Sequence, residues 1–270
     1  MSEKKLKVIV LTHGGAGRLL ELLAALETVE ITGIYIETAT EPKRDLKQKI
    51  KRSIRYDGYL ATLKKFFRPK GSEELKSVQA SQNDLENTAE KLKIPIYKVE
   101  NYHSQDARNL MRAEAADLGI LYGTNIVKEP VFSIPRLGSI NIHQGLAPIY
   151  RGGPTVFWEL FNGEKEIGIT VHFVAAKVDT GDIILQKKLP LEYDFSRYNL
   201  NYEDFLADFR ASLTEPSVHL IAEAVGQIAE GSERRTKQDT SLGKRYRLPT
   251  KSEKNALLRV LKKRRKMSKV

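Results

Sequence analysis

The chain of 270 residues is 41% hydrophobic, which is enough for one large buried core and excludes a wholly disordered protein. It contains no cysteine, so disulfides, thiolate zinc sites and thiol catalysis are excluded. Residues 231–270 hold 15 Lys and Arg against 3 Asp and Glu, whereas the rest of the chain holds 30 and 31, so the net charge of +11 belongs to this basic tail.

The N-terminal segment "MSEKKLKVIVLTHGG" does not have the pattern of a targeting sequence. Its apolar run is too short for the core of a signal peptide. No later run approaches the roughly 20 apolar residues that a membrane span needs. With the lack of cysteine, this predicts a cytoplasmic protein.

Strand and helix patterns alternate along the first two thirds of the chain. "KLKVIVL" is a short apolar strand pattern, the glycine turn "THGGAG" follows it, and "RLLELLAALE" has leucines at helical spacing. A second strand, "ITGIYIE", completes a βαβ unit. Further strands are predicted at 94–100, 117–123, 138–143 and 167–174, with helices from about 104 and from 154. The fold class predicted is α/β, an open doubly wound and mainly parallel sheet.

Two segments depart from this alternation. Between about 42 and 76 a basic insertion has apolar residues at near-helical spacing, which predicts either a surface helix on the sheet edge or a helix for a membrane surface or partner. Residues 193–270 are predicted as a helical, basic extension of a domain formed by residues 1–192. Within it, Thr214 is expected to cap a helix, and Thr250 with Glu253 to form a capping box.

Asn141 and His143 end a predicted strand, where function collects in an open parallel sheet. Alternation along a strand points both side chains to the same side. The segment "VAAKVDTGDIILQ" offers Asp179 or Asp182 to orient the imidazole. His172 is expected to face away and to be structural, while the remaining histidines belong to no motif.

These residues carry a resemblance to a known family. "GSINIHQGLAPIYRGG" resembles the Asn-x-His-x-x-Leu-x-Pro signature of the folate-dependent formyltransferases, and "GITVHFVAAKVDTGDIILQ" resembles their aspartate loop. The likeness extends from about residue 5 to about residue 192. It implies transfer of a formyl group from N10-formyltetrahydrofolate to a primary amine, with no metal expected.

The resemblance assigns catalysis to Asn141, His143 and Asp179. Attack of an amine on the formyl carbon places charge on oxygen, which Asn141 and His143 can stabilise as donors. Asp179 would orient His143, favour its cationic form and help the amine lose its proton. For the folate, the resemblance points to backbone groups of Asn125, Ile126 and Val127 and to the loop with Lys177 and Val178.

Acceptor-binding residues are expected in two loops. The first is the turn with Gly14, Gly15 and Gly17 at a helix N-terminus, which suits an anion, together with Arg18. The purine-pathway member of the family has Gly-Ser-Asn where this chain has Ala16-Gly17-Arg18, a departure that disfavours glycinamide ribonucleotide as acceptor.

The second loop is "YRGG", with Tyr150, Arg151 and Gly152. Arg151 either binds a phosphate or carboxylate or braces the loop. Tyr150 and Trp158 either stack on a base or sugar or serve packing.

The acceptor favoured by resemblance is a nucleotide-linked amino sugar. Family members that act on tRNA carry a C-terminal β-barrel, whereas "RGGPTVFWELFNGEKEIGITVH" and "KRYRLPT" look most like the amino-sugar enzymes. The alternatives are formylation of methionyl-tRNA, with the basic tail on the phosphate backbone, and of glycinamide ribonucleotide. A further alternative is a non-catalytic protein on this fold whose tail binds nucleic acid or an anionic membrane. The helices after residue 192 are a candidate homodimer interface.

Overall fold

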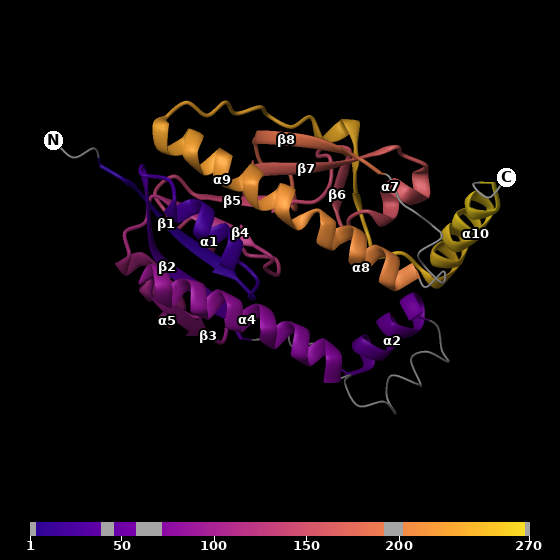
Figure 1. Cartoon of the computed structure of the whole chain (residues 1–270), viewed down its shortest axis with the longest axis horizontal. Helices are drawn as coiled ribbons and strands as arrows, with labels where there is room; N and C mark the ends of the chain where they lie inside the picture. Colours follow the sequence, from indigo (N-terminus) through magenta and orange to yellow (C-terminus); the bar gives the residue numbers. More distant parts are fainter. Residues whose placement is uncertain (1–3, 39–45, 58–71, 192–201, 268–270) are drawn as a thin grey trace.

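A computed structural model describes residues 4–38, 46–57, 72–191 and 202–267. Its centre is a seven-stranded sheet in the order β3-β2-β1-β4-β5-β7-β8 (Figure 1). The strands are β1 (Leu6–Thr12), β2 (Val29–Glu37), β3 (Ile96–Val99), β4 (Leu118–Tyr122), β5 (Ser139–His143), β7 (Glu166–Phe173) and β8 (Ile183–Pro190). The five strands from β3 to β5 are parallel, whereas β7 and β8 are antiparallel to their neighbours. The predicted mainly parallel α/β sheet is confirmed.

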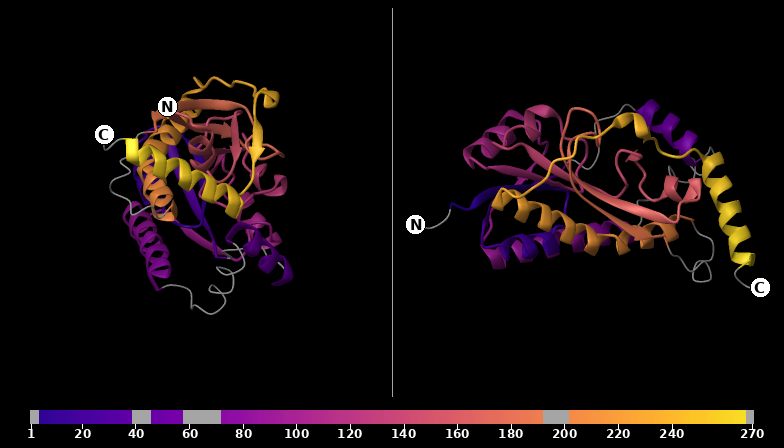
Figure 2. Two further views of the ribbon diagram at one scale, coloured as in Figure 1. Left: turned by 90° about the vertical axis from the view of Figure 1, so that its right-hand side faces the viewer. Right: turned by 90° about the horizontal axis from the view of Figure 1, so that it is seen from above.

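Helices cover both faces of the sheet (Figure 2). The helices of the described ranges are α1 (Gly17–Ala24), α2 (Leu46–Asp57), α4 (Ser72–Leu92), α5 (Gln105–Ala113), α6 (Glu129–Phe132), α7 (Phe157–Asn162), α8 (Tyr202–Ser212), α9 (Thr214–Glu230) and α10 (Lys251–Met267), of which α2 and α10 lie beyond one end of the sheet. No helix in these described ranges is both long and apolar enough to cross a bilayer.

Strand β1 shows how the sequence divides the core into two layers. Val8 and Val10 pack with α1, α4 and α9 in one apolar cluster. Ile9 and Leu11 point the other way and pack with α5 and α6 in a second cluster. Because successive side chains alternate across a strand, a continuous apolar run is what a strand with two covered faces requires.

The helix boundaries hold one confirmation and two corrections. The capping box is present: the N–H of Thr250 donates to Oε2 of Glu253 at 2.7 Å, and the N–H of Glu253 donates to Oγ1 of Thr250 at 3.3 Å. The capping role of Thr214 is wrong, because Leu213 occupies the N-cap position of α9, without a capping hydrogen bond from its side chain, and Thr214 already lies inside the helix. Helix α7 begins at Phe157, later than the predicted start at 154.

Helix α2 confirms helical structure in the basic insertion and contacts α10, while residues 58–71 of that insertion lie outside the described ranges. Helix α9 shares the apolar cluster of β1 and α1. The division at residue 192 stays a prediction.

After α9 the chain runs back along the molecule toward the carboxyl end of β5 (Figure 2). It forms an isolated bridge between Ile183 and Thr236, and then strand β9 (Lys244–Tyr246) pairs in parallel with β6 (Tyr150–Gly152). The C-terminal segment is therefore brought beside the "YRGG" loop, more than ninety residues away in sequence.

Candidate active site

Asn141 and His143 lie at the carboxyl end of β5, with Asp179 beside them on the loop between β7 and β8. Nδ1 of His143 is 3.5 Å from Oδ2 of Asp179. That oxygen also accepts the backbone N–H of Gly152 at 2.8 Å. The alternation of β5 and the loop after β7 thus bring together the three residues that the sequence selects as catalytic.

The imidazole of His143 is buried, and a partner lies near each of its nitrogens. Nε2 lies 2.8 Å from the carbonyl oxygen of Tyr150, so Nε2 carries the hydrogen and donates it. Nδ1 therefore faces Asp179. Burial lowers the pKa of His143, and the negative charge of Asp179 opposes this shift. Neutral His143 is the resting form that burial favours.

His172 lies in the site, and the expectation that it faces away is wrong. The antiparallel register sets His172 of β7 directly opposite Asn141 of β5. Its Nε2 is 3.4 Å from Oδ1 of Asp179 and 3.4 Å from Nδ2 of Asn141, while Nδ1 donates to the carbonyl of Phe173 at 2.7 Å. Two imidazoles therefore flank one carboxylate.

Asp179 is held in a left-handed backbone conformation with φ 52°, which is uncommon for residues other than glycine and is found at functional sites. Burial alone would raise the pKa of its carboxyl. The imidazole of His172 beside the carboxyl, the nearby His143 and the N–H of Gly152 outweigh burial and lower that pKa to about 2. Asp179 is therefore ionised throughout the neutral range.

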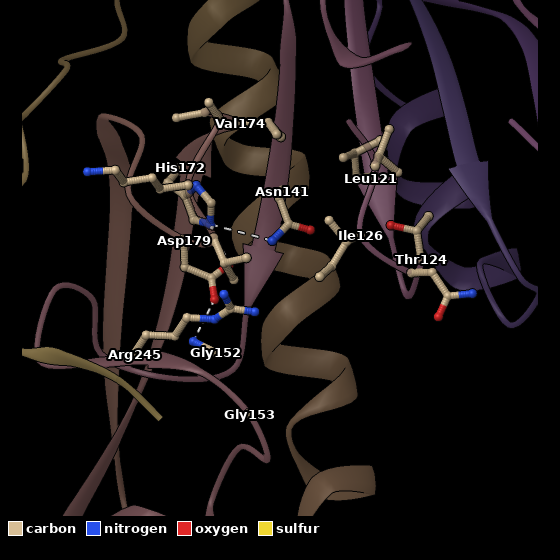
Figure 3. A pocket seen from close by; sticks show the side chains of 16 residues that line it. Leu121, Thr124, Ile126, Asn141, Gly152, Gly153, His172, Val174, Asp179 and Arg245 are labelled. Atoms are coloured by element: carbon tan, nitrogen blue, oxygen red, sulfur yellow. Dashed lines mark hydrogen bonds and ion pairs between the residues drawn. The ribbon is translucent and has the colours of Figure 1, made fainter. Parts of the chain in front are cut away.

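A pocket of about 310 Å³ opens beside these groups (Figure 3). All five residues expected to bind the folate line it, and so do Asn141, Gly152, His172 and Asp179. The five are Asn125, Ile126, Val127, Lys177 and Val178. Ile126 is 64% exposed at this place. A ligand with a flat apolar face would remove that side chain from water.

Two histidines without a motif hold the loop that carries Asn125. The N–H of Asn125 donates to Nε2 of His13 at 3.1 Å, and the N–H of Lys128 donates to Nε2 of His103 at 3.0 Å. A backbone N–H can only donate, so both Nε2 atoms carry lone pairs and both rings are neutral. The sequence analysis passes over both residues because neither has a recognisable neighbour pattern.

The N–H groups of Gly14 and Gly15 in the turn after β1 are already hydrogen-bonded within the protein. The N–H of Gly14 donates to Oγ1 of Thr12 at 3.0 Å, and the N–H of Gly15 donates to the carbonyl of Ser81 in α4 at 3.4 Å. Beyond Gly17, Arg18 forms surface ion pairs with Glu21 and Glu215. The structure does not bring this turn into the pocket with Asn141.

Arg151 braces its loop. Its Nε donates to the carbonyl of Pro148 at 3.1 Å, and an Nη atom lies 3.2 and 3.3 Å from the carbonyls of Thr240 and Gly243. Tyr150 stacks on Tyr246, with ring centroids 5.1 Å apart. These contacts tie the "YRGG" loop to the C-terminal segment.

Arg245 of β9 also lines the pocket. The sequence analysis misses it because its place depends on pairing with a distant strand. The only indication of Arg245 in the sequence is that it lies in the "KRYRLPT" stretch, which resembles the amino-sugar enzymes.

The assembled groups suit transfer between a carbonyl carbon and an amine. His172 is the one side-chain partner of the Asn141 amide among the described residues, so a second amide hydrogen stays available to an oxygen in the pocket. The two imidazoles can take or give a proton while Asp179 keeps its charge. No covalent attachment to the protein is needed.

The comparisons with known proteins show the family and the fold. Residues 6–203 match the family model described as formyl transferase. The methionyl-tRNA formyltransferase of Chlorobium chlorochromatii is 28% identical over 170 residues, which are 63% of this chain and 51% of that protein. This chain spans about half the length of the curated relatives it matches.

Solved structures share the fold. Glycinamide ribonucleotide transformylase 1 from Symbiobacterium toebii superposes with a TM-score of 0.55 at 21% identity, covering 87% of this chain and 95% of that one. A sugar N-formyltransferase from Shewanella sp FDAARGOS_354 gives a TM-score of 0.55 at 14% identity, covering 94% and 86%. Proteins with different acceptors in their names match equally well, so the fold does not select the acceptor.

Proposed function

The chain belongs to the formyl transferase family, and from that premise we propose that it transfers a formyl group from N10-formyltetrahydrofolate to a primary amine. The observation that carries the proposal is the gathering of Asn141, His143 and Asp179 beside a pocket lined by the expected folate loop. The three come from two segments, and a structural role for each alone would not require them to meet.

The pocket suits the folate by its shape and its lining. Leu121, Ile126 and Val174 give apolar surface for a flat ring, and the loop from Ala175 to Asp179 presents backbone groups to it. When bound there, N10-formyltetrahydrofolate supplies the formyl group. Asn125, Ile126, Val127, Lys177 and Val178 would hold it.

The side chains divide the chemical work. Asn141 directs an amide hydrogen toward the place where negative charge develops on oxygen. A carboxyl with a pKa of about 2 is a poor base, so Asp179 orients the imidazoles beside it and stabilises the positive charge that forms when His172 takes up a proton. We assign acceptance of the proton from the amine to His172, which lines the pocket. Buried His143 lies behind the carboxylate and is held there by the hydrogen bond from its Nε2 to the carbonyl of Tyr150.

For the acceptor we favour a nucleotide-linked amino sugar. The support is the sequence of the loop and helix after His143 and of the segment around β9, which look most like the amino-sugar members of the family. Within the described residues after 202, the structure has three helices, a short 3-10 helix and one three-residue strand.

A second candidate is formylation of methionyl-tRNA. The observation that favours it is that the curated relatives, at 28% to 37% identity, carry the name methionyl-tRNA formyltransferase. In this case the basic tail 231–270 would contact the phosphate backbone, and activity would fall steeply with salt.

A homodimer formed through the helices after residue 192 stays a prediction.

The test has two stages. Calorimetry with 5-formyltetrahydrofolate, a stable analogue of the donor, measures folate binding. Release of tetrahydrofolate is then followed with an amino-sugar nucleotide, the matching free amino sugar, glycinamide ribonucleotide and methionyl-tRNA, each at low and high salt. Turnover of the amino-sugar nucleotide supports the proposal. A folded protein that binds no folate refutes it, and folate binding without turnover of any amine leaves a binding protein on this fold.

A further inference from the structure

Strand β9 lies against the active-site loop at unusually close range. Gly152 pairs with Tyr246 and has φ 76°, and a Cβ there would lie 2.7 Å from the carbonyl oxygen of Tyr246 and 3.1 Å from Cγ of Arg245. A Cβ at Gly243 would likewise overlap the carbonyl of Pro148. Glycine at both positions lets the two backbones touch. The stem of Arg245 therefore rests on Gly152, whose N–H holds Asp179.

Side-chain contacts fix β9 in this place. Tyr246 stacks on Tyr150, with an angle of 14° between the rings. Nε1 of Trp158 donates to the carbonyl of Arg247 at 2.8 Å, so hydrogen bonds and stacking hold the strand on both sides of Arg245. The position of the Arg245 backbone is thus set by the same loop that positions Asp179.

The guanidinium of Arg245 faces the pocket without a protein partner among the described residues. Its neighbours on the same segment are engaged: Arg247 pairs with Glu253 at 2.8 Å, and Lys244 lies over the ring of Tyr246 at 4.8 Å. Figure 3 shows Arg245 and Gly152 at one end of the pocket, with Leu121 and Thr124 at the other. An exposed guanidinium held at a pocket wall is a preformed site for a carboxylate or phosphate.

We infer that Arg245 binds an anionic group, a phosphate or carboxylate, of the amine acceptor. This rests on the proposed formyl transfer. The loop from Thr124 to Val127 forms the opposite wall, and we place the acceptor at the end with Gly152 and Arg245, beside Asp179. Ionised Asp179 attracts the amine and repels an anion, so an acceptor with both groups gains from a cation at this end. Arg245 lies outside residues 6–203, so this charge comes from beyond the part that matches the family model.

The test compares the full-length protein with Arg245→Ala, Arg245→Lys and Lys244→Ala. The last removes the same charge from the adjacent residue of β9, which lines neither the main pocket nor the small cavity at His143. Calorimetry measures the Kd of inorganic pyrophosphate and, separately, of 5-formyltetrahydrofolate. We expect Arg245→Ala to weaken pyrophosphate binding about 10- to 100-fold, as loss of hydrogen bonds to a charged group does. Arg245→Lys falls between, and Lys244→Ala matches the wild type.

The two ligands distinguish the sources of the anion. Unchanged pyrophosphate binding in Arg245→Ala, or no binding by the wild type, overturns the inference. A loss confined to 5-formyltetrahydrofolate also overturns it, because the anion would then be the glutamate of the folate. With a working acceptor, Arg245→Ala should raise KM and leave kcat near the wild-type value. Arg245-dependent pyrophosphate binding without turnover of any amine would refute formyl transfer and leave the anion site standing.

Discussion

Replacing His13 and His103 together by Ala should weaken folate binding, although neither residue lines the pocket. Each imidazole accepts a backbone N–H from the loop whose residues Asn125, Ile126 and Val127 form one pocket wall. Without these acceptors the loop loses two of the bonds that fix its position. Folate binding must then also order this loop, which makes the net free energy of binding less favourable.

The magnitude follows from the two hydrogen bonds. A neutral hydrogen bond contributes about 0.5–1.5 kcal/mol net. The side chain of His13 is 24% exposed, so water replaces part of its contribution, and the lower half of that range applies. The double variant should lose about 1–2 kcal/mol, which corresponds to about 5- to 30-fold in the Kd of 5-formyltetrahydrofolate measured by calorimetry.

The same contact makes folate binding sensitive to pH through His103. Burial lowers the pKa of this imidazole, with Lys128 and Arg108 acting in the same direction and Glu37 against it. The neutral form is thus the one that folding favours. The contribution of the neutral His103 ring is complete at a pH above about 6.5, the ordinary pKa of histidine, and is lost as the pH falls below that value. His103→Gln keeps an acceptor and cannot take up a proton, so its folate Kd should vary less between pH 7 and pH 5.

Two results would contradict this reasoning. One is a double Ala variant that binds 5-formyltetrahydrofolate as the wild type does while keeping its Tm. The other is His103→Gln showing the same loss of affinity at acid pH as the wild type. Either would mean that the loop keeps its place without the imidazoles.

Three further predictions concern buried groups of the site. Asp179→Asn should lower kcat at least 100-fold while folate still binds, because a neutral amide cannot stabilise the positive charge that forms on His172; retention of most activity in a steady-state assay would remove that role. His172→Gln should lower kcat about 10²- to 10⁴-fold while folate still binds, and a variant with an unchanged kcat would exclude His172 as the proton acceptor. Burial raises the pKa of Glu159 to about 7, so the folded state favours the neutral acid and wild-type stability falls as the pH rises from about 4.5 through 7. Glu159→Gln cannot ionise, so the difference between its free energy of unfolding and that of the wild type should be about 3 kcal/mol more favourable to the variant at pH 8 than at pH 4. Equal differences in the urea midpoint at the two pH values would contradict this.

Much of the sheet can be predicted because the burial of each strand is visible in the apolar pattern of its own residues. The run from Val8 to Leu11 is apolar on both faces, and the glycine turn after it marks the end of the strand. The placement of Asn141 and His143 on the same side of β5 can also be predicted from the local sequence, because alternate residues of a strand point to the same side. Asp179 was found by resemblance, and the structure brings it within 3.5 Å of His143.

The features that sequence analysis misses depend on contacts between distant segments. His172 faces Asn141 because β7 runs antiparallel to β5, and an alternating pattern does not record the direction in which a strand pairs. The roles of His13 and His103 arise from the path of a loop more than twenty residues away from either ring. The apolar pattern of a strand carries no information on such polar contacts.

The arrangement of β9 separates two tasks within one pocket. Asn141, His143, His172 and Asp179, to which we assign the chemistry of transfer, all lie inside residues 6–203, the part that matches the family model. Arg245 comes from outside that part and lines the pocket at the end where we place the acceptor. Because Gly152 connects β9 to Asp179 through its backbone, the acceptor charge can be set by one side chain on β9 while the catalytic groups keep their geometry. If Arg245 binds the acceptor as proposed, a substitution at Arg245 should change the preferred acceptor and leave the flanked carboxylate intact.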